Sequence, residues 1–315
     1  MSRKRLSLVV LLVAAPFLLL AAVRGSAALA SSVLEKRYPP PGQMISVGDH
    51  KLQLYCMGHG SPTILIEPGM GTDWVAWRLV IPQLLEFNKV CVYDRAGYGW
   101  SEPGPWPRTA GRIAGELHVL LSKAGLEEPY ILVAHSFGGY IARIYASQYR
   151  QSLQGVVLVD PSHEDDSAGA PAPDPAPRSY RLSELIPPLG IQRLRRLYEG
   201  DKALSPQLRN LPRSFQNRYL IGSSLVQLRS ERNEFDSLSG TIAQMRLAPF
   251  PRDLPLTVIT AAQVPSPRHE EIHAKLARSS LFGRQILAKN SGHMIPFDQP
   301  GLIVEAVREM ARLPR

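Results

Sequence analysis

The chain has 315 residues, of which 44% are hydrophobic and 20% are charged. These fractions are typical of folded globular proteins and exclude a wholly disordered chain, and the length allows one large domain or two small ones. Lysine and arginine exceed aspartate and glutamate by 36 − 27 = 9, but charges of both signs are scattered along the chain. Because no basic stripe with interleaved aromatic residues is present, we expect no nucleic-acid partner.

The first thirty residues have the pattern of an export signal or a membrane anchor. Basic residues at positions 3–5 precede an uncharged apolar run over residues 6–23, and Arg24 follows it. A helix of this length, at ~1.5 Å per residue, would span ~27 Å, close to the hydrocarbon core of a bilayer. Since Ala28 and Ala30 also fit a signal-peptidase site, residues 1–30 are predicted to be a membrane anchor or a signal peptide cleaved after Ala30. The positive-inside rule then predicts an exported body.

The next segment, residues 31–43, contains three consecutive prolines and predicts a linker. Beyond it, short apolar runs alternate with amphipathic ones, and the runs at 44–47 and 51–56 predict a β-hairpin. The other expected elements, in chain order, are a strand at 63–67, a helix at 73–86, a strand at 90–94, a helix at 109–124, a strand at 130–134, a helix at 137–149, strands at 155–160 and 256–260, a helix at 268–279, a strand at 284–288 and a helix at 300–312.

This alternation predicts an α/β protein with a mostly parallel, doubly wound sheet, built from residues 44–160 and 254–312. The alternation stops in residues 161–253, which begin with a proline-rich stretch and continue as helix-like, arginine-rich sequence. We therefore expect a helical cap inserted over the carboxyl ends of the strands, where ligands bind in open α/β sheets.

The two cysteines, Cys56 and Cys91, both fall in predicted strands. They are either two buried thiols that pack as small apolar side chains or the two halves of a disulfide. An exported location would favour the disulfide, and the sequence leaves both states open.

Ser136 lies in the most informative segment of the chain. An apolar strand reaches Ala134, and directly after His135 and Ser136 a helical pattern begins, with glycine at 138 and 139. A strand, a serine and a helix in this order, with small residues two positions before and two after the serine, form the context of a nucleophile elbow. The start of the helix favours negative charge that develops beside the serine. Ser136 is therefore the candidate nucleophile.

On these residues the chain resembles the α/β-hydrolase superfamily, and within it the bacterial and plant esterase-like serine hydrolases. The resemblance leaves the insertion unmatched, and Ala134 departs from the glycine that is usual in the elbow motif. It implies the α/β-hydrolase fold and a serine nucleophile, with no metal and no cofactor. The segments that carry it are residues 64–71, 91–104, 132–143, 157–166 and 290–303.

The resemblance also implies a catalytic base and an acid. His293, in a Ser-Gly-His sequence after the last predicted strand, matches the position of the base. The family commonly places the acid in the loop after the next-to-last strand, where the first acids here are Glu270 and Glu271. Asp160, at the end of the strand that follows the nucleophile helix, is the other candidate and the one we favour.

Two backbone N–H groups are expected to form the oxyanion hole, those of Phe137 and of Met70 in the loop after residues 63–67. Asp94 and Arg95 are expected to hold the loop after their strand. The remaining histidines of the core are assigned no catalytic role: His135, His163, His269 and His273.

The resemblance implies a small-molecule or lipid-like carboxylic ester as the substrate, with membrane contact through the N-terminal segment. Peptidase activity of the iminopeptidase type, thioesterase activity and a non-catalytic binding role on the same fold remain alternatives.

Overall fold

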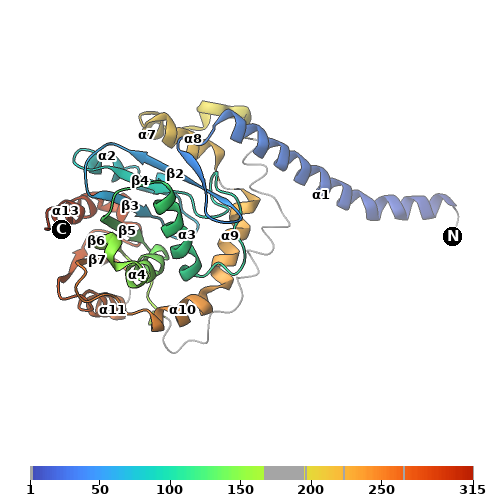
Figure 1. Cartoon of the computed structure of the whole chain (residues 1–315). Coiled ribbons are helices and arrows are strands. Elements are labelled where there is room, and N and C mark those ends of the chain that lie inside the picture. The colour runs from blue at the N-terminus through green and yellow to red at the C-terminus, as the bar shows by residue number, and fades with distance from the viewer. Residues whose placement is uncertain (1–2, 167–194, 196, 223, 265–266, 315) are drawn as a thin grey trace.

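The computed structural model describes residues 3–166, 195, 197–222, 224–264 and 267–314, and its described strands form one sheet in the order β1-β2-β4-β3-β5-β6-β7-β8 (Figure 1). The predicted hairpin of β1 and β2 is present, and β2 also pairs antiparallel with β4, whereas all other neighbours are parallel. The predicted fold class is therefore confirmed. The strands are β1 (Gln43–Ser46), β2 (Lys51–Met57), β3 (Thr63–Glu67), β4 (Val90–Tyr93), β5 (Tyr130–His135), β6 (Leu153–Val159), β7 (Leu256–Ala261) and β8 (Gly283–Ala288).

Helices cover both faces of this sheet. In the central strand β5, Leu132 belongs to the core formed with α3 (Ala110–Lys123) and α4 (Gly138–Gln148) on one face. Its neighbour Val133 belongs to the core formed with α13 (Pro300–Ala311) on the other face. Burial on both faces explains why the parallel strands are continuous apolar runs in the sequence.

The helix expected at residues 73–86 is instead two short elements. η1 (Trp74–Trp77) is a 3₁₀ turn, and the Asp73 side chain caps it by accepting a hydrogen bond of 2.7 Å from the Val75 N–H. α2 (Ile81–Leu84) begins separately, with Pro82 in its first turn. Because proline has no N–H, Pro82 cannot donate the backbone hydrogen bond that would continue a helix from the preceding turn. The helix is therefore interrupted there.

The N-terminal segment differs from its prediction. α1 (Arg3–Arg37) is one continuous helix that runs through the expected anchor and into the expected linker, ending just before the three prolines. Its N-terminal part projects from the body (Figure 1), whereas Ala30 and Leu34 near its other end are fully buried against the core. Within the residues that the structure describes, no helix is long and apolar enough to cross a membrane. The prediction of a transmembrane helix was therefore wrong, because no described stretch of α1 reaches the length and apolarity of a membrane span, and the exported location inferred from that helix loses its support.

The described part of the insertion is mostly helical, and its residues 167–194 lie outside the described residues. Polar contacts tie its helices to the core. Arg218 pairs with Asp94 after β4 at 3.3 Å, and Thr241 Oγ1 accepts a hydrogen bond of 3.1 Å from the Ala110 N–H at the start of α3. The elements of the insertion are η3 (Gly200–Ala203), α7 (Pro206–Arg209), α8 (Arg213–Ile221), α9 (Leu225–Asp236) and α10 (Leu238–Leu247).

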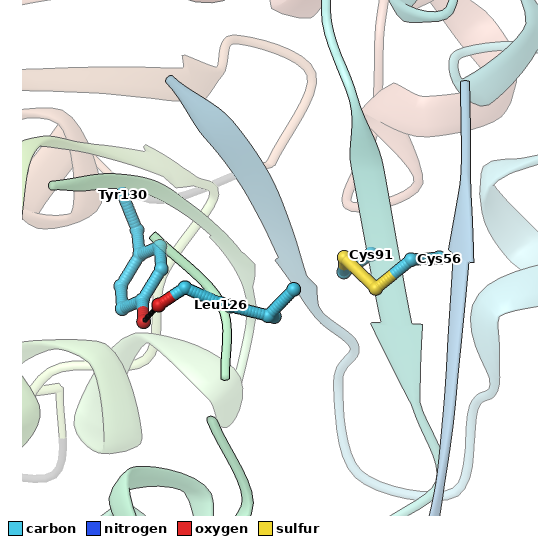
Figure 2. Close-up of a disulfide and its surroundings, with 4 residues drawn as sticks. All are labelled: Cys56, Cys91, Leu126 and Tyr130. Atoms are coloured by element: carbon cyan, nitrogen blue, oxygen red, sulfur yellow. Dashed lines mark hydrogen bonds between the residues drawn. A yellow bond between two sulfur atoms is a disulfide. The ribbon is translucent and has the colours of Figure 1, made fainter. Parts of the chain in front are cut away.

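A disulfide joins Cys56 of β2 to Cys91 of β4, so the structure decides the state that the sequence left open (Figure 2). The two residues are register partners in the antiparallel pair, which brings their Cα atoms to 4.0 Å. Figure 2 also shows Tyr130 at the start of β5, whose hydroxyl donates a hydrogen bond of 2.9 Å to Leu126 O. Cys91 and Tyr130 lie towards the amino ends of β4 and β5, opposite to the loops described next.

Candidate active site

Ser136 occupies the sharp turn between β5 and α4. Its φ is +54°, in the left-handed region that side chains other than glycine rarely adopt, and its N–H is held by Val159 O of β6 at 3.2 Å. Gly138 is required behind it, since a Cβ there would lie 2.7 Å from Glu67 O and 2.8 Å from Pro68 O. The strained backbone and the missing Cβ are the features of a nucleophile elbow.

Asp160 and His293 meet at the carboxyl ends of the strands. Asp160 directly follows β6 with a φ of +42° and is 1% exposed, whereas His293 lies in the loop between β8 and α12 (Ile295–Asp298) and its side chain is half exposed. His293 Nδ1 lies 2.6 Å from Asp160 Oδ2. Glu270 and Glu271, the alternative acids, are exposed on α11 (Pro267–Ala277). The structure therefore brings Asp160 to the imidazole and leaves both glutamates outside.

The other carboxylate oxygen of Asp160 is also occupied. Asp160 Oδ1 accepts a hydrogen bond of 2.9 Å from the Ala261 N–H at the end of β7 and one of 2.8 Å from His269 Nε2. Burial of Asp160 disfavours the charged carboxylate, but the hydrogen bonds from His269 and His293 outweigh burial and hold the pKa of Asp160 well below its ordinary value. Asp160 is thus an ionised acceptor, and the sequence analysis missed His269 because a histidine on an amphipathic helix carries no local pattern.

His135, next to Ser136 in the chain, contacts His293. Its Nε2 lies 2.9 Å from His293 O, and the two rings have centroids 4.6 Å apart. Burial, together with the neighbouring His293, lowers the pKa of His135 to about 4. The ring is therefore neutral at pH 7, with its Nε2–H donating to the His293 carbonyl.

The loop after β3 lies against the elbow and carries Met70. A Cβ at Gly69 would lie 3.2 Å from Ser136 Cβ, so this backbone passes directly beside the serine. Among the described residues, neither the Met70 N–H nor the Phe137 N–H has a hydrogen-bond acceptor. Two unoccupied N–H groups beside a serine are what an oxyanion hole requires.

Arg95 fixes the loop after β3, which was not foreseen. Its guanidinium donates to Pro68 O at 2.7 Å, to Gly69 O at 2.9 Å and to Glu67 Oε1 at 2.7 Å. Its Nε donates to Glu234 Oε1 of α9 at 2.9 Å, and all three charged side chains are at least 97% buried. A buried cation held by two carboxylates thus connects the insertion to the candidate oxyanion loop. The loop after β4 is also bonded as expected, since the Tyr98 N–H donates to Arg95 O at 2.8 Å and the Trp100 N–H to Asp94 Oδ2 at 3.2 Å.

The cluster of Asp160, His269 and His273 is the only described group of side chains spaced to hold a metal ion, with ligand atoms all within 4.8 Å of one another. Both ring nitrogens of His273 are already bonded, Nε2 to Pro161 O at 2.8 Å and Nδ1 to Thr260 Oγ1 at 3.1 Å. Because an ion would have to displace these bonds, we interpret the cluster as a hydrogen-bonded group.

Two curated relatives match most of this chain. "Probable transporter efuK" from Hormonema carpetanum is 26% identical over 84% of this chain but only 42% of its own length. "Uncharacterized protein YqjL" from Bacillus subtilis is 25% identical over 89% of this chain and 93% of its own length. The chain thus spans less than half of the first relative and nearly all of the second.

Solved structures share the fold at lower identity. A candidate epoxide hydrolase from Pseudomonas aeruginosa has a TM-score of 0.65 at 18% identity, covering 86% of this chain and 97% of its own. A thermophilic esterase from Thermogutta terrifontis has a TM-score of 0.58 at 24% identity, covering 84% and 93%. An enol-lactonase from Burkholderia xenovorans has a TM-score of 0.60 at 15% identity, covering 85% and 99%.

At these identities the solved structures establish the shared fold, and their names describe several kinds of hydrolase. The family described as "alpha/beta hydrolase fold" matches residues 62–300, which include the elbow, the insertion and His293. With the strand order and the elbow geometry, this match means that the chain belongs to the α/β-hydrolase fold family.

Proposed function

We propose that the protein is a serine hydrolase that cleaves carboxylic esters of small-molecule or lipid-like alcohols or acids through an acyl-enzyme. The observation that carries the proposal is the 2.6 Å hydrogen bond between His293 Nδ1 and the buried Asp160 carboxylate, at the same sheet edge as Ser136. A carboxylate that holds Nδ1–H leaves Nε2 free to take a proton from a serine hydroxyl.

In the acylation step, Ser136 Oγ attacks the ester carbonyl carbon while its proton passes to His293 Nε2. The carbonyl oxygen becomes an oxyanion and accepts hydrogen bonds from the N–H groups of Phe137 and Met70. The intermediate collapses when the bond to the leaving alkoxide breaks, and the imidazolium gives that alkoxide its proton. Ser136 Oγ has no hydrogen-bond partner among the described residues, so we expect its contact with His293 to form in the substrate complex.

In the deacylation step, water enters the site vacated by the alcohol. His293 Nε2 takes a proton from the water as its oxygen attacks the acyl carbon, and the same two N–H groups hold the second oxyanion. The Ser136–acyl bond then breaks, Oγ regains the proton and the carboxylic acid leaves. Asp160 stays ionised throughout and stabilises each imidazolium.

The identity of the nucleophile supports esters over epoxides. The members of this family that open epoxides are similar to this chain in fold but use an aspartate at the elbow, whereas this chain has Ser136 there. The similarity to an esterase and to an enol-lactonase supports the same choice, since both names describe cleavage of an ester bond. We also propose residues 161–253 as the cap over this site, because α9 contacts the candidate oxyanion loop.

The test is active-site labelling with a fluorophosphonate probe, followed by hydrolysis of p-nitrophenyl esters of increasing acyl length. We expect the wild-type protein to react at one serine and the S136A variant not to react. A wild-type protein that resists the probe and cleaves no ester would be a non-catalytic member of the family. Faster cleavage of an aminoacyl amide or a thioester than of any oxygen ester would assign the alternative substrates.

A further inference from the structure

Asp160 is shared between two imidazoles, and only one of them has a place in the proposed reaction. His293 Nδ1 approaches Oδ2 at 2.6 Å and His269 Nε2 approaches Oδ1 at 2.8 Å. The two rings come from different parts of the fold, since His269 lies on α11 and His293 in the loop after β8. The second imidazole therefore requires an explanation of its own.

The bonds determine which ring nitrogens carry hydrogen. An ionised carboxylate only accepts hydrogen bonds, so His269 donates from Nε2 and His293 donates from Nδ1. The Ala261 N–H donates to Oδ1 as well, at 2.9 Å. Two donors on Oδ1, one from the backbone and one from α11, restrain rotation of the carboxylate and keep Oδ2 directed at His293.

We propose that His269 is a positioning residue for the Asp160–His293 pair, acting both by fixing the Asp160 carboxylate and by placing a titratable charge beside it. The inference rests on the proposed function. His269 holds the acid in the orientation that His293 needs, and its protonated form partly neutralises Asp160. A less negative Asp160 stabilises the imidazolium of His293 less.

The groups around His269 determine when it carries this charge. It faces Asp160 after β6, Asp166 beyond it and His273 on its own helix, whose ring centroid is 4.2 Å away. The hydrogen bond to Asp160 raises the pKa of His269, against the opposing effect of burial. His273 does not compete, because burial and the neighbouring His269 lower its pKa to about 4. His269 is thus the ring of this group whose protonated form its surroundings favour.

Two substitutions separate the two parts of the proposal. His269→Gln places an amide donor near the position of Nε2 and removes the charge, whereas His269→Leu removes the donor and the charge together. His59→Gln is the matched control, because His59 is exposed and remote from Asp160 in the described contacts.

For His269→Gln we expect the acid limb of the kcat/KM profile to move to higher pH by about half a unit to one unit, since one positive charge is lost near the base. For His269→Leu we expect the same movement and, in addition, a kcat about 10-fold lower, because the carboxylate is free to rotate. His59→Gln should match the wild type in both. An acid limb that stays at the wild-type pH in both His269 variants would overturn the charge effect.

A spectroscopic measurement tests the positioning without relying on turnover. The His293 Nδ1–H that donates to Asp160 should give a far-downfield proton resonance in the wild-type protein, retained in His269→Gln and broadened by exchange with water in His269→Leu. An unchanged resonance in His269→Leu would overturn the positioning role. If the wild-type protein cleaves no ester, the proposed function fails, while this resonance still reports whether His269 holds the pair. Loss of probe labelling in His269→Gln as complete as in His293→Gln would show instead that His269 is the base.

Discussion

Ser136 combines a strained backbone with a partly exposed hydroxyl. Its left-handed backbone is held by the Val159 carbonyl and by the close approach of α4 to the end of β3 at Gly138. Strain of this kind costs about 1–3 kcal/mol and persists only where the surrounding structure determines it. The turn is therefore a property of the neighbouring elements, and changing the hydroxyl alone should leave it in place.

We predict that Ser136→Ala lowers kcat by several orders of magnitude and leaves the free energy of unfolding within about 0.5 kcal/mol of wild type, because only a hydroxyl without a described partner is removed. Ester hydrolysis and urea unfolding measure the two effects. Near-wild-type hydrolysis by the variant would contradict the mechanism, and a large loss of stability would mean that the hydroxyl has a structural role.

Substitution of Asp160 tests whether it is the acid that acts on His293. Asp160→Asn should lower kcat by up to about 10⁴-fold, because the amide favours the wrong tautomer of His293 and no longer stabilises the imidazolium. Glu270→Gln and Glu271→Gln are the controls, since both side chains are exposed on α11, and they should retain wild-type activity. If either glutamate variant lost as much activity as Asp160→Asn, the 2.6 Å contact would not be the catalytic one.

Among the secondary-structure elements, α9 is joined to the loop after β3. Arg95 bonds to two backbone carbonyls of that loop, while Glu234 of α9 holds the other side of its guanidinium and accepts a hydrogen bond of 2.8 Å from the Tyr98 hydroxyl. Since the loop also carries Met70, movement of α9 would change the direction of the candidate oxyanion N–H. The insertion thus contributes to the site through α9, while near its start the Ser162 N–H donates a hydrogen bond of 3.0 Å to Ser136 O.

We predict that Glu234→Gln lowers the free energy of unfolding by on the order of 3 kcal/mol, because Arg95 stays buried with one carboxylate fewer. It should also slow fluorophosphonate labelling of Ser136, since the loop is held less firmly. Glu199→Gln provides the control, as it breaks a solvent-exposed pair with Arg195, which should contribute less than about 0.5 kcal/mol. Equal stability of the two variants would argue against the buried network.

The disulfide between β2 and β4 closes a loop of 35 residues. In the chain-entropy account, a loop of this size stabilises the folded state by about 3–4 kcal/mol. The double variant Cys56→Ala/Cys91→Ala should lose that amount in urea unfolding, whereas its labelling at Ser136 should remain, because the bridge lies in the antiparallel part of the sheet. Reduction of the wild-type protein should reproduce the loss, and a variant as stable as the oxidised wild type would contradict it.

For the molecule as a whole, buried histidines make stability depend on pH. His273 is fully buried with its pKa lowered to about 4 from an ordinary 6.5. Between these values the unfolded chain binds a proton that the folded chain does not, so the contribution of His273 is present above pH 6.5 and is lost as the pH falls towards 4. The lowered pKa of His135 also makes the folded state less stable as the pH falls. Burial raises the pKa of Glu67 to about 7, so its contribution to stability is instead lost as the pH rises.

We predict that His273→Gln, which can still donate to Pro161 O, makes stability less sensitive to acid. The difference in unfolding free energy between wild type and variant should change by about 1.4 kcal/mol per pH unit between pH 6.5 and 4, in the direction that favours the variant at low pH. His135 and Glu67 are present in both proteins, so their effects cancel in this difference. Parallel stability curves from urea unfolding at several pH values would contradict the prediction.

The sequence by itself determined the α/β fold, the strand positions and the elbow around Ser136. These features follow from short-range rules, since strands buried on both faces need continuous apolar residues and a tight turn into a helix needs small ones. The same rules failed at residues 73–86, where Pro82 divides the expected helix, and for the apolar run in α1, whose buried end belongs to the body.

The tertiary structure alone decided which carboxylate reaches His293, and it revealed the contacts of Arg95 and His269. Asp160 and His293 are 133 residues apart, and Arg95 and Glu234 are 139 apart. Contacts over such separations depend on strand order and on where the insertion packs, neither of which leaves a periodic pattern in the local sequence. Asp160 lies near His293 because β6, β7 and β8 are adjacent and parallel, so their carboxyl ends lie at one edge. A glutamate one helical turn into α11 is instead turned outward to solvent.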